Sequence, residues 1–341
     1  MSLRFPRVAI IGGAGYVGSA LVPHLLQAGY DVTVVDLFLY GHEVFDGCAA
    51  HPRLHRVPLD IRDEAALTRA LTGMDAVIHL ACISNDPSFE LDPQLGRSIN
   101  YDAFFGVLRA VQSQGVTRFI YASSSSVYGV KEQPDVREET PCQPLTDYSK
   151  YKLLCEEALK AEEMGSCEWV IVRPATICGY APRLRLDLTV NILTIHALVN
   201  KRVTVFGGSQ LRPNLNMHDM VAAYQLLLEA DGATLHGQTF NVGYQNRSVS
   251  DIAELVRRQV GDPSVTIVAQ STNDLRSYHV NSDRIQQRLG FAPRWTITDA
   301  IQSLCDAYRA GLMTEPLANP RYYNIKLMQS VKLDEQPIGT R

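Results

Sequence analysis

A glycine-rich segment near the N-terminus restricts the fold more than any other feature of the sequence. Gly12, Gly15 and Gly18 follow the apolar run Val8 to Ile11 and precede an apolar-periodic, helix-like segment. In a turn between a strand and a helix, glycines let backbone N–H groups approach a pyrophosphate, which the positive end of the helix dipole also stabilises. The segment therefore predicts a dinucleotide-binding turn, with an ordinary glycine-rich turn as the alternative.

Short β-branched runs alternate with longer amphipathic segments through the first half of the chain. The runs are RVAII, DVTVV, LHRVPL, DAVIHLA, TRFIYAS and EWVIVR. Strands that alternate with helices form a parallel sheet, and runs that are apolar on successive residues indicate a sheet covered on both faces. The sequence therefore predicts an α/β fold with a doubly wound parallel sheet.

The regular alternation weakens after Arg173-Pro174, where a smaller α/β lobe is expected to begin. We expect a nucleotide-binding domain over 1–176, to which 216–243 returns with a strand at Thr239 to Val242. The segments 177–215 and 244–341 would form the interleaved substrate lobe and the C-terminal tail. The last thirty or so residues look loosely structured and carry little functional signal.

Composition and charge argue against several classes of protein. The net charge is only −4 and the basic residues are scattered, so nucleic acid is not an expected partner. No apolar run approaches the roughly 20 residues of a membrane span, and no signal peptide is apparent. The seven cysteines and nine histidines show no metal-ligand spacing, so no metal site is expected. Free thiols are typical of a reducing compartment, and a cytoplasmic enzyme is predicted.

Asp36 ends the second predicted strand. A carboxylate there can accept hydrogen bonds from the adenosine ribose hydroxyls and would repel a 2′-phosphate. The residue thus favours NAD over NADP, and a carboxylate of a strand-end turn is the alternative.

Tyr148 and Lys152 are four residues apart at the start of a helical run, so they share one face of the helix. A free tyrosine has a pKa of about 10, and lowering it to about 7 requires about 4 kcal/mol of differential stabilisation. Lys152 and an oxidised nicotinamide ring are two cations that could supply it. Tyr148 is therefore a candidate base, although an exposed helical pair of this kind also occurs by chance.

A serine run, Ser123 to Ser126, ends a predicted central strand at the sheet edge where ligands of α/β proteins bind. A serine there can donate to the substrate oxygen whose proton Tyr148 removes. A serine-rich loop without a catalytic role is the alternative.

Together these motifs resemble the extended short-chain dehydrogenase/reductase family, in its nucleotide-sugar epimerase and dehydratase branch. Asp60-Ile61, His79-Leu80-Ala81, Asn100 and Phe240 to Gly243 add to the resemblance, which covers nearly the whole chain. It implies a Rossmann fold, with Tyr148 as base, Lys152 as its partner and ribose ligand, and Ser124 as the serine that contacts substrate. The implied NAD ligands are Gly12, Gly15, Tyr16, Val17, Gly18, Asp36, Asp60, Ile61, Leu80, Ala81, Asn100, Tyr148 and Lys152.

The same resemblance implies a nucleotide-sugar substrate and a homodimer. Arg212 and Arg276 would grip the nucleotide diphosphate, because a planar guanidinium matches paired phosphate oxygens. The other implied substrate residues are Ser124, Ser125, Thr176, Asn191 near the phosphate, and Val205 in the base pocket, where inward core packing is an alternative. Asn85, Asp86, Arg183 and Arg185 are further candidates for sugar contacts, or are solvated loop residues.

Departures from the family pattern bear on the reaction. Dehydratases of the family carry an acidic pair directly after the serine, whereas this chain has Ser125 and Ser126. Glu and Cys, usual at position 126 in the decarboxylases and the 3,5-epimerases, are also missing. The expected activity is a 4-epimerase type of oxidation and reduction at one carbinol. A ketoreductase fits the same residues, while a dehydratase, a decarboxylase, a non-catalytic NAD-sensing regulator and a scaffold fit less well.

Overall fold

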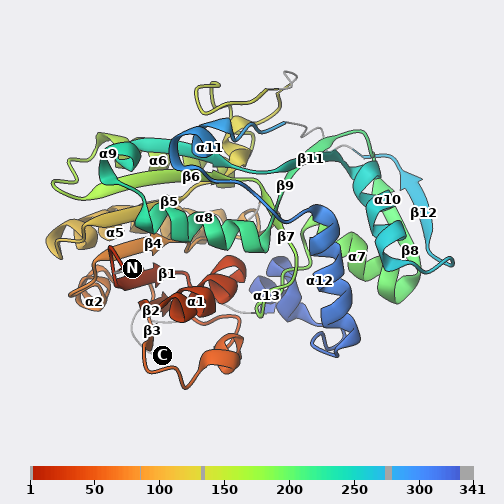
Figure 1. The fold of residues 1–341 in the computed structure, drawn as a ribbon, viewed down its shortest axis with the longest axis horizontal. Coiled ribbons are helices and arrows are strands. Elements are labelled where there is room, and N and C mark those ends of the chain that lie inside the picture. The colour runs from red at the N-terminus through yellow and green to blue at the C-terminus, as the bar shows by residue number, and fades with distance from the viewer. Residues whose placement is uncertain (1–2, 85, 132–134, 273–278, 331–341) are drawn as a thin grey trace.

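The computed structural model describes residues 3–84, 86–131, 135–272 and 279–330. It has two lobes, a large one built on a seven-stranded sheet and a smaller one beside it (Figure 1). The sheet is parallel throughout, in the order β10-β6-β5-β4-β1-β2-β3. Its strands are β1 (Arg7–Ile11), β2 (Asp31–Asp36), β3 (Leu54–Pro58), β4 (Ala76–His79), β5 (Arg118–Ala122), β6 (Glu168–Pro174) and β10 (Gln238–Val242).

Helices cover both faces of this sheet. On one face, α1 (Tyr16–Ala28) and α8 (Met217–Glu229) pack together and share a core with β1, β2 and β6. On the other face lie α2 (Glu64–Ala70), α5 (Ala103–Ser113) and α6 (Asp147–Ala161). The inner strands are apolar on successive residues, as in Val8 to Ile11 of β1, because both of their faces are covered. The prediction of a doubly wound α/β sheet is confirmed.

The smaller lobe has its own core. Two short sheets form it, one of β11 (Gln245–Ser248), β9 (Leu211–Asn216) and β7 (Thr176–Cys178), the other of β12 (Thr266–Gln270) and β8 (Arg202–Phe206). Three helices pack around this core, α7 (Thr189–Asn200), α10 (Val249–Val260) and α12 (Ile297–Arg309). The lobes interleave along the chain, since β10 pairs with β6 of the large sheet between segments of the smaller lobe.

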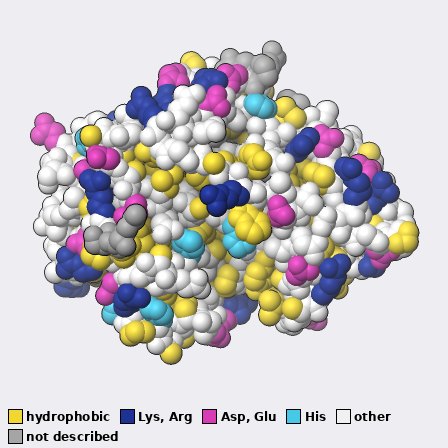
Figure 2. Space-filling view, in the orientation of Figure 1, with side chains coloured by type: hydrophobic (Ala, Val, Ile, Leu, Met, Phe, Trp, Pro, Cys, Tyr) yellow, Lys and Arg dark blue, Asp and Glu magenta, His cyan; other side chains and the backbone are white. Residues whose placement is uncertain are grey.

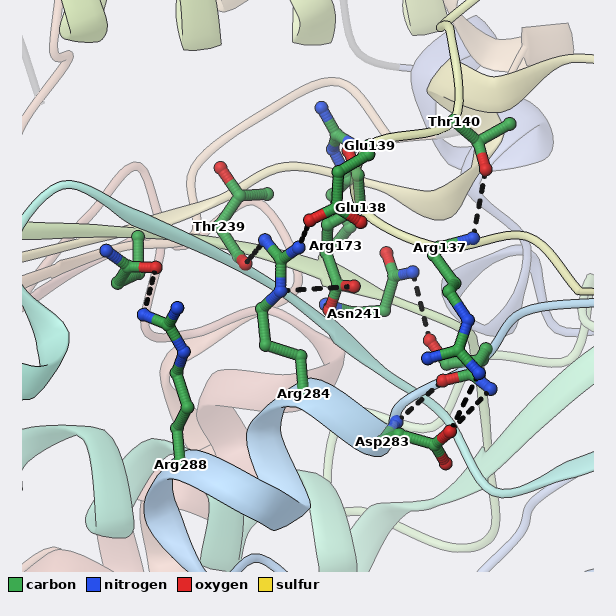
Figure 3. Close-up of polar contacts among 12 residues, drawn as sticks. Arg137, Glu138, Glu139, Thr140, Arg173, Thr239, Asn241, Asp283, Arg284 and Arg288 are labelled. Atoms are coloured by element: carbon green, nitrogen blue, oxygen red, sulfur yellow. Dashed lines mark hydrogen bonds and ion pairs between the residues drawn. The ribbon is translucent and has the colours of Figure 1, made fainter.

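One helix lies elsewhere than the expected division of 244–341 would place it. Helix α11 (Asp283–Leu289) packs against β10, and Ile285 is buried in the core of the large lobe. Polar contacts secure it there, because Arg284 reaches from α11 to Glu138 and Glu139, and the Glu138 carboxylate accepts from Asn241 N at 2.8 Å (Figure 3).

Residues 320–330 of the tail are folded, so the expectation of loose structure is wrong for this part. It forms a 3-10 turn, η4 (Pro320–Tyr322), and helix α13 (Asn324–Ser330). Asn324 and Leu327 are buried, because both turn toward the large lobe. Residues 320–330 therefore belong to the folded unit.

Charges of both signs are interspersed on the described part of the face shown in Figure 2. Among the described residues, no helix is both long and apolar enough to cross a membrane.

Candidate active site

A cavity of about 660 Å³ opens at the carboxyl ends of the parallel strands, where the order reverses between β1 and β4. Ligands of open α/β sheets bind at such a point. The wall combines the glycine turn, the ends of β2 and β5, the start of α6, the segment after β7, and α13.

The glycine turn holds two chain segments too close for side chains. Gly12 has φ +81°, and a Cβ there would lie 2.4 Å from Ala81 N; a Cβ on Gly18 would lie 2.2 Å from Gly13 O. Helix α1 begins directly after Gly15, which offers no side-chain cap. Gly12, Gly15 and Gly18 thus form a cradle that side chains would fill, and it lies at the positive end of a thirteen-residue helix. We call it the glycine cradle, and it fits the diphosphate of a dinucleotide.

Asp36 lies beside this turn at the end of β2. Its carboxylate accepts from Ala14 N at 2.9 Å and Phe38 N at 2.8 Å, and it borders the cavity. Burial raises the pKa of Asp36, whereas the two N–H donors and the charge of Arg183 oppose that rise. The residue is placed to accept from ribose hydroxyls, so this end of the cavity fits the adenosine half of NAD.

The start of α6 carries Tyr148 and Lys152. Thr146 caps the helix in a reciprocal arrangement with Ser149, which fixes the first turn next to the cavity. Lys152 is buried and donates from Nζ to Ala122 O at 2.7 Å, at the end of β5. Tyr148 borders the cavity one turn earlier on the helix. The structure therefore brings the tyrosine, the lysine and the serine loop to one wall.

The serine loop follows β5 and opens the 3-10 turn η3 (Ser125–Tyr128). Ser124 caps this turn, because its Oγ accepts from Ser126 N at 3.1 Å and from Ser126 Oγ at 2.9 Å. Ser123 turns away from this role and donates to the Glu156 carboxylate at 2.5 Å. All four serines of the run border the cavity with Tyr148, and the hydroxyl of Ser123 is the one bonded to a buried carboxylate.

A buried ion pair supports both helix α6 and the serine loop, and the sequence analysis did not predict it. Arg173 on β6 donates to both carboxylate oxygens of Glu156 on α6, at 2.9 and 2.7 Å. It also donates to Tyr128 Oη at 2.9 Å, and this hydroxyl donates to Asn241 Oδ1 at 2.7 Å. Burial alone would lower the pKa of Arg173, but the contact with Glu156 raises it above its usual value. The pair locks α6 to the serine loop and the sheet.

Most of the predicted ligands border the cavity. Three do not. Asn100 is buried behind the cavity wall, where its Oδ1 accepts from Ile83 N and its Nδ2 donates to Ile83 O. Asn191 is buried between Gly179, Tyr16 and Arg185, and Val205 packs in the core of the smaller lobe. The residues that border the cavity are Gly12, Gly15, Tyr16, Val17, Gly18, Asp36, Asp60, Ile61, Leu80, Ala81, Ser124, Ser125, Tyr148, Lys152, Thr176 and Arg212.

The structure gives these three residues roles other than a place on the cavity wall. Amide side chains such as Asn100 and Asn191 have donors and acceptors that satisfy nearby backbone groups, and Val205 follows the inward-packing alternative. Arg276 and Asn85 lie outside the described residues, as does the side chain of Asp86. Arg183 and Arg185 do border the cavity. The wall also includes residues that the sequence did not suggest, namely Tyr40, Asn324, Ile325, Leu327 and Met328.

His79 packs behind the cavity, between the rings of Phe104, Phe119 and Tyr121. Burial, helped by the charge of Lys152, lowers the pKa of His79 to about 3. Below pH 6.5 the imidazole of this residue is protonated in the unfolded chain, whereas it stays neutral in the folded protein. The free energy of unfolding therefore falls as the pH drops toward 3. At pH 5 this loss amounts to about 2 kcal/mol.

We expect His79→Leu to remove this part of the pH dependence, whatever its effect on stability at pH 7.5. Denaturant titrations at pH 7.5, 6 and 5 would measure it, with His218→Leu at an exposed position as the control. If the free energy of unfolding of His79→Leu depends on pH as steeply as that of the wild type, a neutral buried imidazole is contradicted.

The fold and the site define a class: an enzyme on a doubly wound sheet that binds NAD at the carboxyl ends of its strands. Residues 8–243 match the NAD dependent epimerase/dehydratase family, and the chain belongs to this family. It is thus an NAD-dependent enzyme of the epimerase and dehydratase kind. The resemblance identified from the motifs is confirmed.

Similar proteins come from both branches of the family. The UDP-glucose 4-epimerase of Lacticaseibacillus casei is 26% identical over 321 residues, covering 84% of this chain and 96% of that enzyme. MoeE5, solved in complex with UDP-glucose and NAD, is 25% identical with a TM-score of 0.78, covering 90% of this chain and 99% of that one. The dTDP-glucose 4,6-dehydratase DesIV of Streptomyces venezuelae has a TM-score of 0.82 at 22% identity, over 91% and 99% of the two chains, and shows the fold.

Proposed function

We propose that this protein is an NAD-dependent nucleotide-sugar epimerase, which oxidises one sugar hydroxyl to a ketone and reduces the ketone from the other face. The observation that carries the proposal is the composition of the wall around Tyr148. Ser124, Ser125, Ser126 and Thr176 supply hydroxyl groups there. Elimination of water or loss of CO₂ would need a further acid or base, and the serine loop supplies neither.

The carboxylates of the described cavity wall support this reading. Asp36 and Asp60 lie at the proposed adenosine end, and Asp60 is paired with Arg62 at 2.6 Å. Asp187 is paired with Arg185 at 2.6 Å. Each of these carboxylates therefore already has a partner or a place at the adenosine end. Transfer of a hydride and a proton at a carbinol needs no further carboxylate, unlike elimination or decarboxylation.

The proposed roles follow from position. Tyr148 takes the proton from the sugar hydroxyl, Lys152 stabilises the phenolate, and Ser124 donates to the same sugar oxygen. When bound, NAD supplies the acceptor for the hydride that leaves the carbinol carbon and returns to the opposite face. Tyr148 then gives its proton back to the oxygen, so no net oxidation occurs and the cofactor stays in place.

The proposed substrate is a nucleoside diphosphate sugar, as in the UDP-glucose 4-epimerases that this chain resembles. Arg212 on β9 borders the cavity and would bind the diphosphate together with Arg276. Thr176, at the start of β7, would contact the sugar.

We also propose a cytoplasmic homodimer. Tyr101, Phe105 and Tyr151 are partly exposed. The ring of Tyr101, just before α5, contacts the rings of Phe105 on α5 and Tyr151 on α6, which suits a helix-to-helix interface. Sedimentation of the purified protein at twice the mass of the chain is the expected result, and a monomer at all concentrations would contradict it.

A test of cofactor recycling separates the epimerase from a ketoreductase that uses the same residues. We expect the purified protein to release NAD on denaturation, and the untreated protein to isomerise a nucleotide sugar without added nicotinamide cofactor. Chromatography of a panel of nucleotide sugars before and after incubation would measure this. Product formation only with stoichiometric NADH or NADPH would establish the ketoreductase instead, and NAD binding without any turnover would favour a regulator.

A further inference from the structure

Arg183 carries a buried guanidinium on the wall of the cavity. Its side chain is 4% exposed, and it forms no ion pair within the described residues. The guanidinium lies over the ring of Tyr40, 3.6 Å from its centroid, and Nη2 donates to Asn324 Oδ1. Its Nε has no hydrogen-bond partner in the described part of the chain. A buried charge is ordinarily paired, so an anion is the partner that this geometry lacks.

The position of Arg183 indicates which anion would fit. Its backbone N–H donates to Ser19 Oγ at 3.0 Å, and Ser19 N donates to Gly15 O at 2.9 Å. Arg183 thus lies against the first turn of α1, beside the glycine cradle. Its charge also acts on Asp36, at the end of β2. The residue borders the same cavity as the glycine turn and Asp36.

Asn324 holds this guanidinium from the C-terminal side. It is buried, its Oδ1 accepts from Tyr40 Oη at 3.2 Å as well as from Arg183, and its Nδ2 donates to Ser84 Oγ at 2.9 Å and Ser84 O at 3.2 Å. One side chain therefore joins the segment after β2, the segment after β4 and the segment after β7. Helix α13 also brings Ile325, Leu327 and Met328 to the cavity wall.

We propose that Arg183 is the counter-ion of the diphosphate of bound NAD, and that Asn324 makes the C-terminal helix part of the cofactor site by holding the guanidinium in place. The inference rests on the cofactor of the family and is independent of the proposed epimerase reaction. A guanidinium suits a diphosphate because its donors match paired phosphate oxygens.

Binding to protein freed of cofactor tests the proposal without any activity assay. We expect Arg183→Met to weaken NAD and ADP-ribose binding by roughly 10- to 100-fold in calorimetric titrations, as for a lost hydrogen bond to a charged group. Arg183→Lys, which keeps the charge, should recover part of the loss. Binding of UDP should not change, because Arg212 belongs to the other diphosphate site.

Asn324→Ala supplies a second variant that leaves Arg183 in place. We expect it to weaken NAD and ADP-ribose binding by about tenfold with UDP binding unchanged, whereas Gln329→Ala, at an exposed position of the same helix, should match the wild type. Unchanged NAD affinity in folded Arg183→Met would overturn the assignment, as would a loss confined to UDP. Unchanged NAD affinity in Asn324→Ala would overturn the role of the C-terminal helix. Thermal melting without cofactor verifies that each variant is folded.

Discussion

Tyr148→Phe is expected to lower kcat by about 10³-fold while NAD binding stays within about twofold of the wild type. The substitution removes only the hydroxyl that takes the sugar proton and keeps the ring at the cavity wall. Lys152, which donates to Ala122 O, and the glycine cradle are untouched, so the cofactor site should persist. Steady-state kinetics on the nucleotide sugar that the wild type converts would measure the loss, and the NAD content of the purified variant would measure binding.

Tyr151→Phe is a matched control on the same helix. Its ring packs against Phe89 and Tyr101 rather than at the cavity, so loss of its hydroxyl should leave kcat within about threefold. Full activity in Tyr148→Phe would exclude it as the base. Equal losses in both variants would mean that the helix, rather than the phenol of Tyr148, had been disturbed.

Local sequence patterns predicted the large lobe well, because its elements depend on short-range features. Successive apolar residues such as Val8 to Ile11 require a strand covered on both faces, and the spacing of Gly12, Gly15 and Gly18 marks the turn after it. Tyr148 and Lys152 share a helix face by periodicity alone. These predictions needed no knowledge of which distant segments meet.

The missed features depend on contacts between distant parts of the chain. Asn324 meets Ser84 and Arg183, which are 240 and 141 residues away in the sequence, and nothing in the local pattern of the tail marks it. Asn191 and Val205 matched family positions, yet their side chains satisfy a backbone turn and fill a core. Which face of an element a side chain takes is decided by packing, and a motif alone does not specify it.

The ion pair of Glu156 and Arg173 is also a long-range feature, and it should dominate the stability of the site. We expect Glu156→Gln to lower the free energy of unfolding by about 3 kcal/mol or more. The amide has nearly the same size, but it leaves the positive charge of Arg173, 3% exposed, without its counter-ion. Ser123 would lose its charged acceptor as well. Because the pair joins α6 to β6, activity should fall along with stability.

Denaturant unfolding followed by circular dichroism would measure this, with Glu157→Gln at the next, exposed position as the control. The control should change stability by less than about 0.5 kcal/mol. A double variant, Glu156→Gln with Arg173→Met, identifies the cause. If the unpaired charge is responsible, removing that charge should restore part of the loss, since a buried pair replaced on both sides costs less than a pair broken on one side. If the double variant is less stable than Glu156→Gln, the hydrogen bonds of Arg173 to Tyr128 and Glu138 matter more than its charge.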